Sequence, residues 1–218
     1  MPETHEFLLK FLSYFQNKVY NQSMHTTSPE KLSTHLRSGQ VYRREDFLAF
    51  SKAVDRDLCQ LSTQGVLEKV APGLYYAPKI SRFGTLPPNE NVLIKAFLRS
   101  NQFLLLSWNA YNSLELGLTQ VYNRVIVYNR KRFGIFRLAD QEFDFRRPAY
   151  GFPKKLTRAF LVVDLLNNAK ELFDEDITLL KMNIKTVLSK KLLKEAMHCA
   201  KKYGKVGTKK FLSAIIHE

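Results

Sequence analysis

The chain has 218 residues, of which 45% are hydrophobic and 25% charged, and its formal net charge is +14. This composition is typical of a globular protein with one large or two small domains. No apolar run approaches the roughly 18 residues needed to cross a bilayer, which excludes a membrane-spanning protein. The positive charge favours an anionic partner, most commonly a nucleic acid, with an acidic protein or a merely solvated basic surface as alternatives.

The charge is unevenly distributed along the chain. Residues 1–80 contain 10 Lys/Arg and 8 Asp/Glu (net +2), residues 121–160 contain 10 and 3 (net +7), and residues 181–218 contain 10 and 2 (net +8). The positive field therefore comes mostly from the second half of the chain. That half is expected to contact either phosphates or an acidic protein.

The cellular compartment is predicted from the cysteines and the N-terminus. Cys59 and Cys199 are far apart in sequence, and Cys59 adjoins an apolar stripe, so a buried thiol is favoured over a disulfide. The first residues lack the basic region and cleavage site of a signal peptide. We therefore expect a cytoplasmic protein.

In chain order, the first 80 residues predict the elements of a winged helix-turn-helix. The expected helices and strands are a helix over 5–20, a helix over 28–36, a strand at 41–42, a short helix over 45–50, a helix over 52–64, and strands over 66–70 and 74–77. A helix that ends at a glycine and is followed at once by a hairpin is typical of the wing. This module usually inserts its second helix into the DNA major groove, but it also serves in packing and protein contacts.

The helix over 52–64 is the expected reading helix. Val54, Leu58 and Leu61 recur on one helical face, and Ser51 is predicted as its N-cap. Gly65 stands where a left-handed C-cap residue is expected.

The remainder predicts a second domain. Residues 81–89 have the composition of a linker, which gives domains 1–80 and 90–218. Expected next are a helix over 90–99, a strand over 103–108, a short helix over 110–116, strands over 124–129, 133–138 and 142–146, and helices over 156–172, 179–188, 190–203 and 208–216. The fold class is α+β: a winged helix, then a mixed α/β domain with a helical C-terminal part.

Two sets of candidate binding residues follow from this assignment. The DNA-binding set is Arg43, Arg44, Ser51, Lys52, Asp55, Arg56, Gln60, Lys69 and Lys79. Within it, Arg56 is the candidate for bidentate guanine contact, with a local ion pair to a neighbouring acid as the alternative, and the outlying cations suit phosphates. The second set is Arg130, Lys131 and Arg132, expected at a hairpin tip, with Arg146 and Arg147; it suits phosphates or an acidic protein, and a solvated loop is the alternative.

Catalysis is not expected from this sequence. Asp140, Glu142 and Asp144 are the densest acidic group near strands, where metal-dependent nucleases place carboxylates, but alternation predicts all three on a solvent face. The histidines lack ligand spacing and no phosphate-binding glycine loop is present, so neither a cofactor nor a metal is expected. A metal-dependent nucleic-acid-processing enzyme remains the alternative of a different class.

Several segments resemble AbiEi-type antitoxins, the antitoxin half of type IV toxin–antitoxin systems. They are AVDRDLCQLSTQGVLEKVAPGLYYAPK, SRFGTLPPNE, NAYNSLELGLTQ, LVVDLLNNAKEL and KKYGKVGTKKFL. The resemblance implies an N-terminal winged helix that binds operator DNA and represses its own operon. It also implies a C-terminal domain that counters a nucleotidyltransferase-like toxin. A stand-alone winged-helix regulator without a toxin is the alternative.

Overall fold

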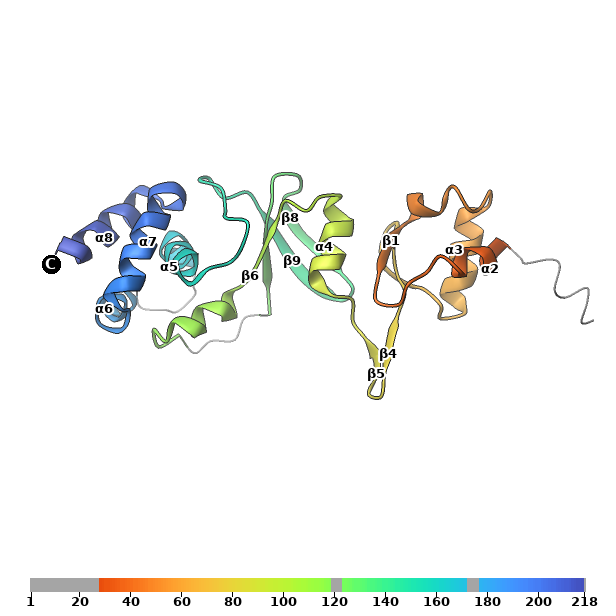
Figure 1. The fold of residues 1–218 in the computed structure, drawn as a ribbon, viewed down its shortest axis with the longest axis horizontal. Helices are drawn as coiled ribbons and strands as arrows, with labels where there is room; N and C mark the ends of the chain where they lie inside the picture. Colours follow the sequence, from red (N-terminus) through yellow and green to blue (C-terminus); the bar gives the residue numbers. More distant parts are fainter. Residues whose placement is uncertain (1–27, 119–122, 172–176, 218) are drawn as a thin grey trace, which may run out of the picture. The chain divides into compact units, whose positions relative to one another are not determined.

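The computed structural model describes residues 28–118, 123–171 and 177–217, and the chain forms two compact units, Met1–Val92 and Leu93–Glu218. Helices and several sheets occur together, so the predicted α+β class is confirmed (Figure 1). The predicted helix over 5–20 lies outside the described residues. Within the described part, no helix has both the length and the apolar character needed to cross a bilayer.

The N-terminal unit contains two small sheets and two α-helices among its described residues. Its elements are α2 (Ser28–Ser33), β1 (Val41–Arg43), the 3-10 helix η1 (Arg44–Phe47), α3 (Val54–Thr63), β2 (Glu68–Ala71), β3 (Leu74–Tyr76), β4 (Lys79–Ser81) and β5 (Gly84–Leu86). Strand β3 pairs antiparallel with both β1 and β2, with Tyr76 opposite Val41 on one side and Glu68 on the other. The core under this sheet is built from Leu32, Phe47, Val54, Leu58, Leu61 and Leu67.

Helix α3 packs through the face predicted from the sequence, because Val54, Leu58 and Leu61 are all buried. Its start was placed wrongly: the N-cap is Ala53, not Ser51. The Ser51 hydroxyl instead accepts from the Ala53 N–H and donates to the Asp57 carboxylate, so it stabilises the turn before the helix.

Two glycines allow the turns on either side of β2. Gly65 follows α3 with a φ of +73°, and the Val66 N–H donates to the Leu61 carbonyl, which closes the helix end. Gly73 has a φ of +71° in the β2–β3 turn, and its carbonyl accepts from the Arg44 N–H. That bond ties the hairpin to the start of η1.

The stretch 81–89, for which we predicted a linker, contains β5 and the end of β4. These strands pair antiparallel with Lys79 opposite Leu86 and Ser81 opposite Gly84. A short hairpin thus follows the three-stranded sheet directly.

The C-terminal unit has a four-stranded sheet in the order β6-β7-β9-β8. Its first elements are α4 (Glu90–Leu98, which begins at the end of the N-terminal unit), β6 (Leu104–Ser107), the 3-10 helix η2 (Trp108–Leu114), β7 (Val125–Tyr128), β8 (Gly134–Leu138) and β9 (Gln141–Arg146). Strand β7 runs parallel to β9, while β6–β7 and β8–β9 are antiparallel. Helix α4 covers one face, where Phe97 packs on Phe136 and Phe145.

The elements that follow this sheet in the chain are all helical, and they share one core with it. They are α5 (Arg158–Asn168), the 3-10 helix η3 (Ala169–Glu171), α6 (Ile177–Val187), α7 (Lys190–Tyr203) and α8 (Val206–His217). Thr157 caps α5, whose residues 160–165 are all buried, and Ser189 caps α7. Leu106, Ile126 and Tyr128 of the sheet join the helices in one core. The predicted strands and C-terminal helices are confirmed to within a few residues.

Candidate nucleic-acid interface

The outward face of α3 is polar. Asp55, Arg56 and Gln60 of the helix are exposed, as is Lys52 just before it. The Arg56 side chain is 76% exposed, and its Nε lies 3.5 Å from Oδ1 of Asp57. Arg56 therefore forms the ion pair with a neighbouring acid that was its predicted alternative role, while most of its side chain remains exposed to solvent.

Asp57 does not belong to this outward face, although it is next to Arg56. It is completely buried, and its Oδ2 accepts hydrogen bonds from the hydroxyls of Ser28 and Ser51. The hydrogen bonds from Ser28 and then Ser51 hold the pKa of Asp57 below its ordinary value, although desolvation opposes them. The carboxylate thus joins α2, the turn before α3 and α3 itself.

Asp55 is exposed but engaged. Its two oxygens accept from Nε and an Nη of Arg44, both at 2.6 Å, in a bidentate pair. The hydrogen bond to Arg44 lowers the pKa of Asp55 and raises that of the guanidinium. This pair links η1 to α3 and cancels the negative charge beside Arg56.

The other predicted DNA-binding cations flank α3. Arg43 is the N-cap of η1 and pairs with Glu45 at 3.1 Å. Lys69 on β2 and Lys79 on β4 are exposed. The structure thus places the predicted set around α3 and the two hairpins, with Arg44 committed to Asp55 and Ser51 to Asp57.

Arg130, Lys131 and Arg132 do not form a hairpin tip, as we predicted. Strands β7 and β8 are not neighbours, because β9 lies between them. Asn129, which is buried, shapes the connection: its Oδ1 accepts from the N–H groups of Lys131 and Arg132, both at 2.8 Å. Lys131 donates to the Arg99 carbonyl and the Arg132 guanidinium lies 4.4 Å from the Phe97 ring centroid, so both cations help hold α4.

Arg146 and Arg147 differ in what they contact. Arg146 is engaged by Asp144 at 2.7 Å and by Glu171. Burial lowers the pKa of Arg146, but the hydrogen bonds to both carboxylates outweigh it and leave the pKa above its ordinary value. Arg147 is exposed and, with Lys205, lines a pocket of about 280 Å³.

The acidic residues near 140–144 do not share one solvent face, which corrects our prediction. Asp140 and Glu142 are exposed, whereas Asp144 is 7% exposed and paired to Arg146. Asp140 lies beside Arg137 at 3.2 Å. Among the described residues, no group of three or more His, Cys, Asp or Glu side chains is arranged to hold a metal ion.

Cys59, predicted to be buried, is exposed.

A buried polar cluster in the C-terminal unit was not predicted. Asp164 is 3% exposed and accepts from the hydroxyls of Tyr111 at 2.7 Å and Tyr128 at 2.9 Å. Desolvation raises the pKa of Asp164, and it also raises those of both tyrosines. A carboxylate within an otherwise apolar helix was the only sequence signal for it. The cluster joins η2, β7 and α5.

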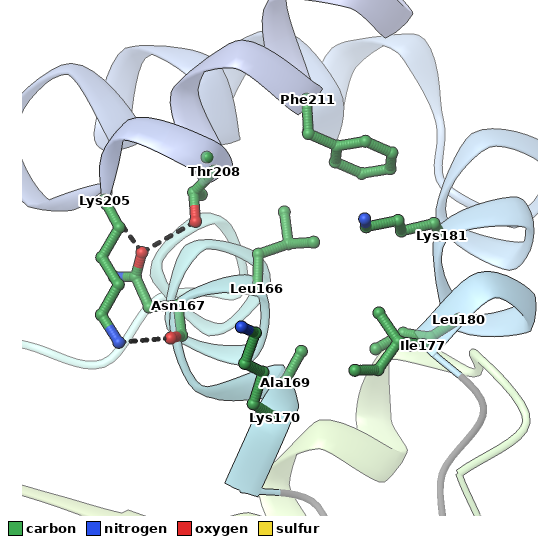
Figure 2. Close-up of a pocket in the computed structure, with 11 residues that line it drawn as sticks. Leu166, Asn167, Ala169, Lys170, Ile177, Leu180, Lys181, Lys205, Thr208 and Phe211 are labelled. Carbon is green, nitrogen blue, oxygen red and sulfur yellow. Dashed lines mark hydrogen bonds between the residues drawn. The ribbon is translucent and has the colours of Figure 1, made fainter.

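A second pocket of about 410 Å³ lies between α5, α6 and α8 (Figure 2). Its wall is largely apolar, with Leu166 and Phe211 facing each other across it, and the Lys181 ammonium lies 5.7 Å from the Phe211 ring centroid. Asn167 accepts from the Thr208 hydroxyl and the Lys205 N–H. The polar groups at this side of the pocket thus fix the junction of α5 with α8.

A scan of family models matches residues 29–194 to a family of unknown function (DUF6088). The chain belongs to this family. The search of curated proteins gives no match.

The part matched to DUF6088 contains every residue of both predicted binding sets. It begins in α2 and ends within α7, so it includes α3, both N-terminal sheets and the four-stranded sheet. The 410 Å³ pocket lies partly outside it, since Lys205, Thr208 and Phe211 follow residue 194.

Proposed function

We propose that the N-terminal unit is a winged helix-turn-helix that binds the operator of its own gene. We further propose that the whole chain is the antitoxin and autorepressor of a type IV toxin–antitoxin pair. The observation that carries the DNA-binding part is the order η1, α3, β2 and β3, with β1 pairing to β3. In a winged helix, this order leaves one face of the second helix free for the major groove.

The chemistry of α3 supports this assignment. With Asp57 buried and Asp55 paired to Arg44, Lys52, Arg56 and Gln60 dominate the outward face. An arginine that contacts guanine N7 and O6 in bidentate fashion discriminates against other bases by about 1–3 kcal/mol. Arg56 supplies that contact in the proposal, and Lys52, Lys69 and Lys79 supply phosphate contacts.

The antitoxin part of the proposal rests on the sequence resemblance to AbiEi-type antitoxins. The net charge of +8 over residues 181–218 is compatible with it, because it suits an acidic protein surface. The proposed partner is a nucleotidyltransferase-like toxin. A stand-alone regulator with the same winged helix is the second candidate, and it would have no such partner.

The operator claim is tested by fluorescence anisotropy with the DNA just upstream of the gene and with a scrambled duplex, over a salt series. We expect binding to the upstream DNA to be tighter by roughly a thousandfold. Arg56→Ala should weaken only the specific complex, by roughly 5- to 150-fold. Arg37→Ala is the control, because Arg37 is also exposed in this unit but lies in the loop after α2.

Equal, weak and steeply salt-dependent binding to both duplexes would refute the operator claim, because the net charge of +14 would then account for it. The antitoxin claim is tested separately, by co-expression with a nucleotidyltransferase-like protein encoded next to this gene. Relief of its growth arrest by the full chain supports the claim. Persistence of the arrest, or the absence of such a gene, favours the stand-alone regulator.

A further inference from the structure

The β4–β5 hairpin exposes large apolar side chains to solvent. Phe83 is 84% exposed and Ile80 is 80% exposed, the two highest values among the large apolar residues described. Both are on a ribbon of two three-residue strands joined by Arg82 and Phe83. Exposed apolar side chains gathered in this way mark an interaction site.

The charge around the hairpin indicates the chemistry of its partner. From Lys69 to Asn89 the sequence has three cations, Lys69, Lys79 and Arg82, and no acidic residue. The Arg82 guanidinium lies 4.6 Å from the centroid of the Phe83 ring, so the tip combines a cation with an aromatic face. A second copy of this chain, with its net charge of +14, would be repelled, whereas a polyanion would be attracted.

Two hydrogen bonds of the Ser81 hydroxyl order the backbone of the tip. The Ser81 hydroxyl accepts from the Phe83 N–H at 3.2 Å and donates to the Gly84 carbonyl at 2.9 Å. Gly84 has a φ of +108°, which a residue with a Cβ rarely adopts. These bonds order the backbone of the turn that carries Arg82 and Phe83, which lowers the backbone part of the entropy cost of binding.

The base of the hairpin is fixed to the three-stranded sheet. The Tyr76 side chain is buried, and its hydroxyl donates to the Leu86 carbonyl at 2.9 Å and accepts from the Lys79 N–H at 3.3 Å. One side chain of β3 thus holds both strands of the ribbon. The hairpin projects as a braced arm, as Figure 1 shows for β4 and β5.

We propose that this hairpin is a second DNA contact, whose tip enters the minor groove and wedges Phe83 between two base pairs. This inference rests on the proposed DNA-binding function and adds a way of deforming the operator. Apolar wedges inserted between base steps unstack them and bend the duplex by roughly 20–90°. Arg82 accompanies the wedge and neutralises one phosphate.

The test uses the full chain and an upstream duplex labelled at its two ends for energy transfer. Wild type should bring the ends together by a bend in that range, and Phe83→Ala should abolish the bend while changing affinity by less than about tenfold. Phe83→Leu should restore the bend, since leucine also serves as a wedge. Arg82→Ala should reduce the slope of log affinity against log salt by about 1, and the control Arg37→Ala should not.

The outcomes separate this inference from the operator claim. One outcome is that binding depends on Arg56, while Phe83→Ala leaves the bend unchanged and Arg82→Ala leaves the salt slope unchanged. This outcome would overturn the hairpin inference and keep the operator claim. That result would also be obtained if the tip docked a protein. A Phe83-dependent bend in upstream and scrambled DNA alike, without preference between them, would keep the hairpin inference and overturn the operator claim. If the wild-type protein bends neither duplex, the proposed insertion of Phe83 between base pairs is overturned.

Discussion

Replacement of Asp57 by alanine should destabilise the N-terminal unit strongly, although Asp57 is one of two acids that flank an exposed arginine. The carboxylate is fully buried and accepts hydrogen bonds from Ser28 and Ser51, which lie on either side of the three-stranded sheet's first strand in sequence. Its loss would leave two hydroxyls without their acceptor and separate α2 from the turn that precedes α3.

The expected magnitude follows from these contacts. Each hydrogen bond to a charged group contributes about 1.5–3 kcal/mol to stability. Removal of the carboxylate also relieves the desolvation of Oδ1, which is buried and has only the 3.5 Å ion pair with Arg56 in place of a hydrogen bond, and this offsets about 1–2 kcal/mol. We therefore expect a loss of about 2–4 kcal/mol for Asp57→Ala. Asp55→Ala is the matched control, and its effect should be far smaller because exposed ion pairs contribute little.

Urea unfolding followed by two probes assigns the loss to a unit. Far-UV circular dichroism reports both units, whereas the fluorescence of Trp108, the single tryptophan, reports the C-terminal unit, where it is 5% exposed. Asp57→Ala should shift part of the dichroism transition to lower urea and leave the fluorescence transition unchanged. An equal effect of Asp55→Ala, or a shift seen only in fluorescence, would refute the reasoning.

The same residue predicts a pH dependence. Because the pKa of Asp57 is lowered in the folded chain, its stabilisation is present above the unfolded value of about 3.9 and is lost as the pH falls through the folded value. The difference in stability between wild type and Asp57→Asn should therefore be constant near neutrality and shrink in strong acid. A difference that grows as the pH falls below about 4 contradicts this assignment.

Two further predictions concern the C-terminal unit. Because burial raises the pKa of Asp164, its contribution is full below the unfolded value of about 3.9 and is lost as the pH rises through the folded value. The stability of wild type relative to Asp164→Asn, measured by Trp108 fluorescence in urea, should thus fall as the pH rises above about 4. A difference that stays constant with pH would contradict this. Gly204→Ala should cost about 1–3 kcal/mol, because its Cβ would meet the Ala200 carbonyl oxygen at 2.7 Å. In Gly207→Ala, the added Cβ in α8 would meet no atom within 4 Å, so this change should be neutral or stabilising by up to about 1 kcal/mol. Equal losses of stability in the two variants, measured by thermal unfolding, would refute the steric argument.

The sequence was sufficient wherever periodicity decides the structure. Val54, Leu58 and Leu61 recur at helical spacing, so the buried face of α3 followed directly. The alternation around Phe143 and Phe145 likewise located β9 and its hairpin with β8. In such elements, burial of one apolar face contributes most of the stability, and the spacing of hydrophobic residues reveals that face.

The roles of buried polar residues could not be predicted from hydrophobic periodicity. Periodicity treats Asp57 as a surface acid and Ser51 as a cap, because their partner Ser28 is distant in sequence. Asp164 was visible only as an exception in an apolar helix. The prediction that residues 130–132 form a hairpin tip was wrong for a topological reason. Strand β7 pairs with β9, which follows β8 in the chain, and the local sequence does not specify that strand order.

These buried and paired acids change how the charge of the N-terminal unit should be assessed. The net charge of +2 over residues 1–80 suggests weak attraction to DNA, and two acids beside Arg56 suggest repulsion. Yet Asp57 is inside the unit and Asp55 is neutralised by Arg44, so a phosphate or base edge approaching α3 would encounter mainly Lys52 and Arg56. On the proposed function, the near-neutral unit limits nonspecific binding, which depends on total charge, while α3 retains the groups that discriminate between bases. Under that proposal, the helix would favour specificity over affinity, as expected for a repressor of one operon.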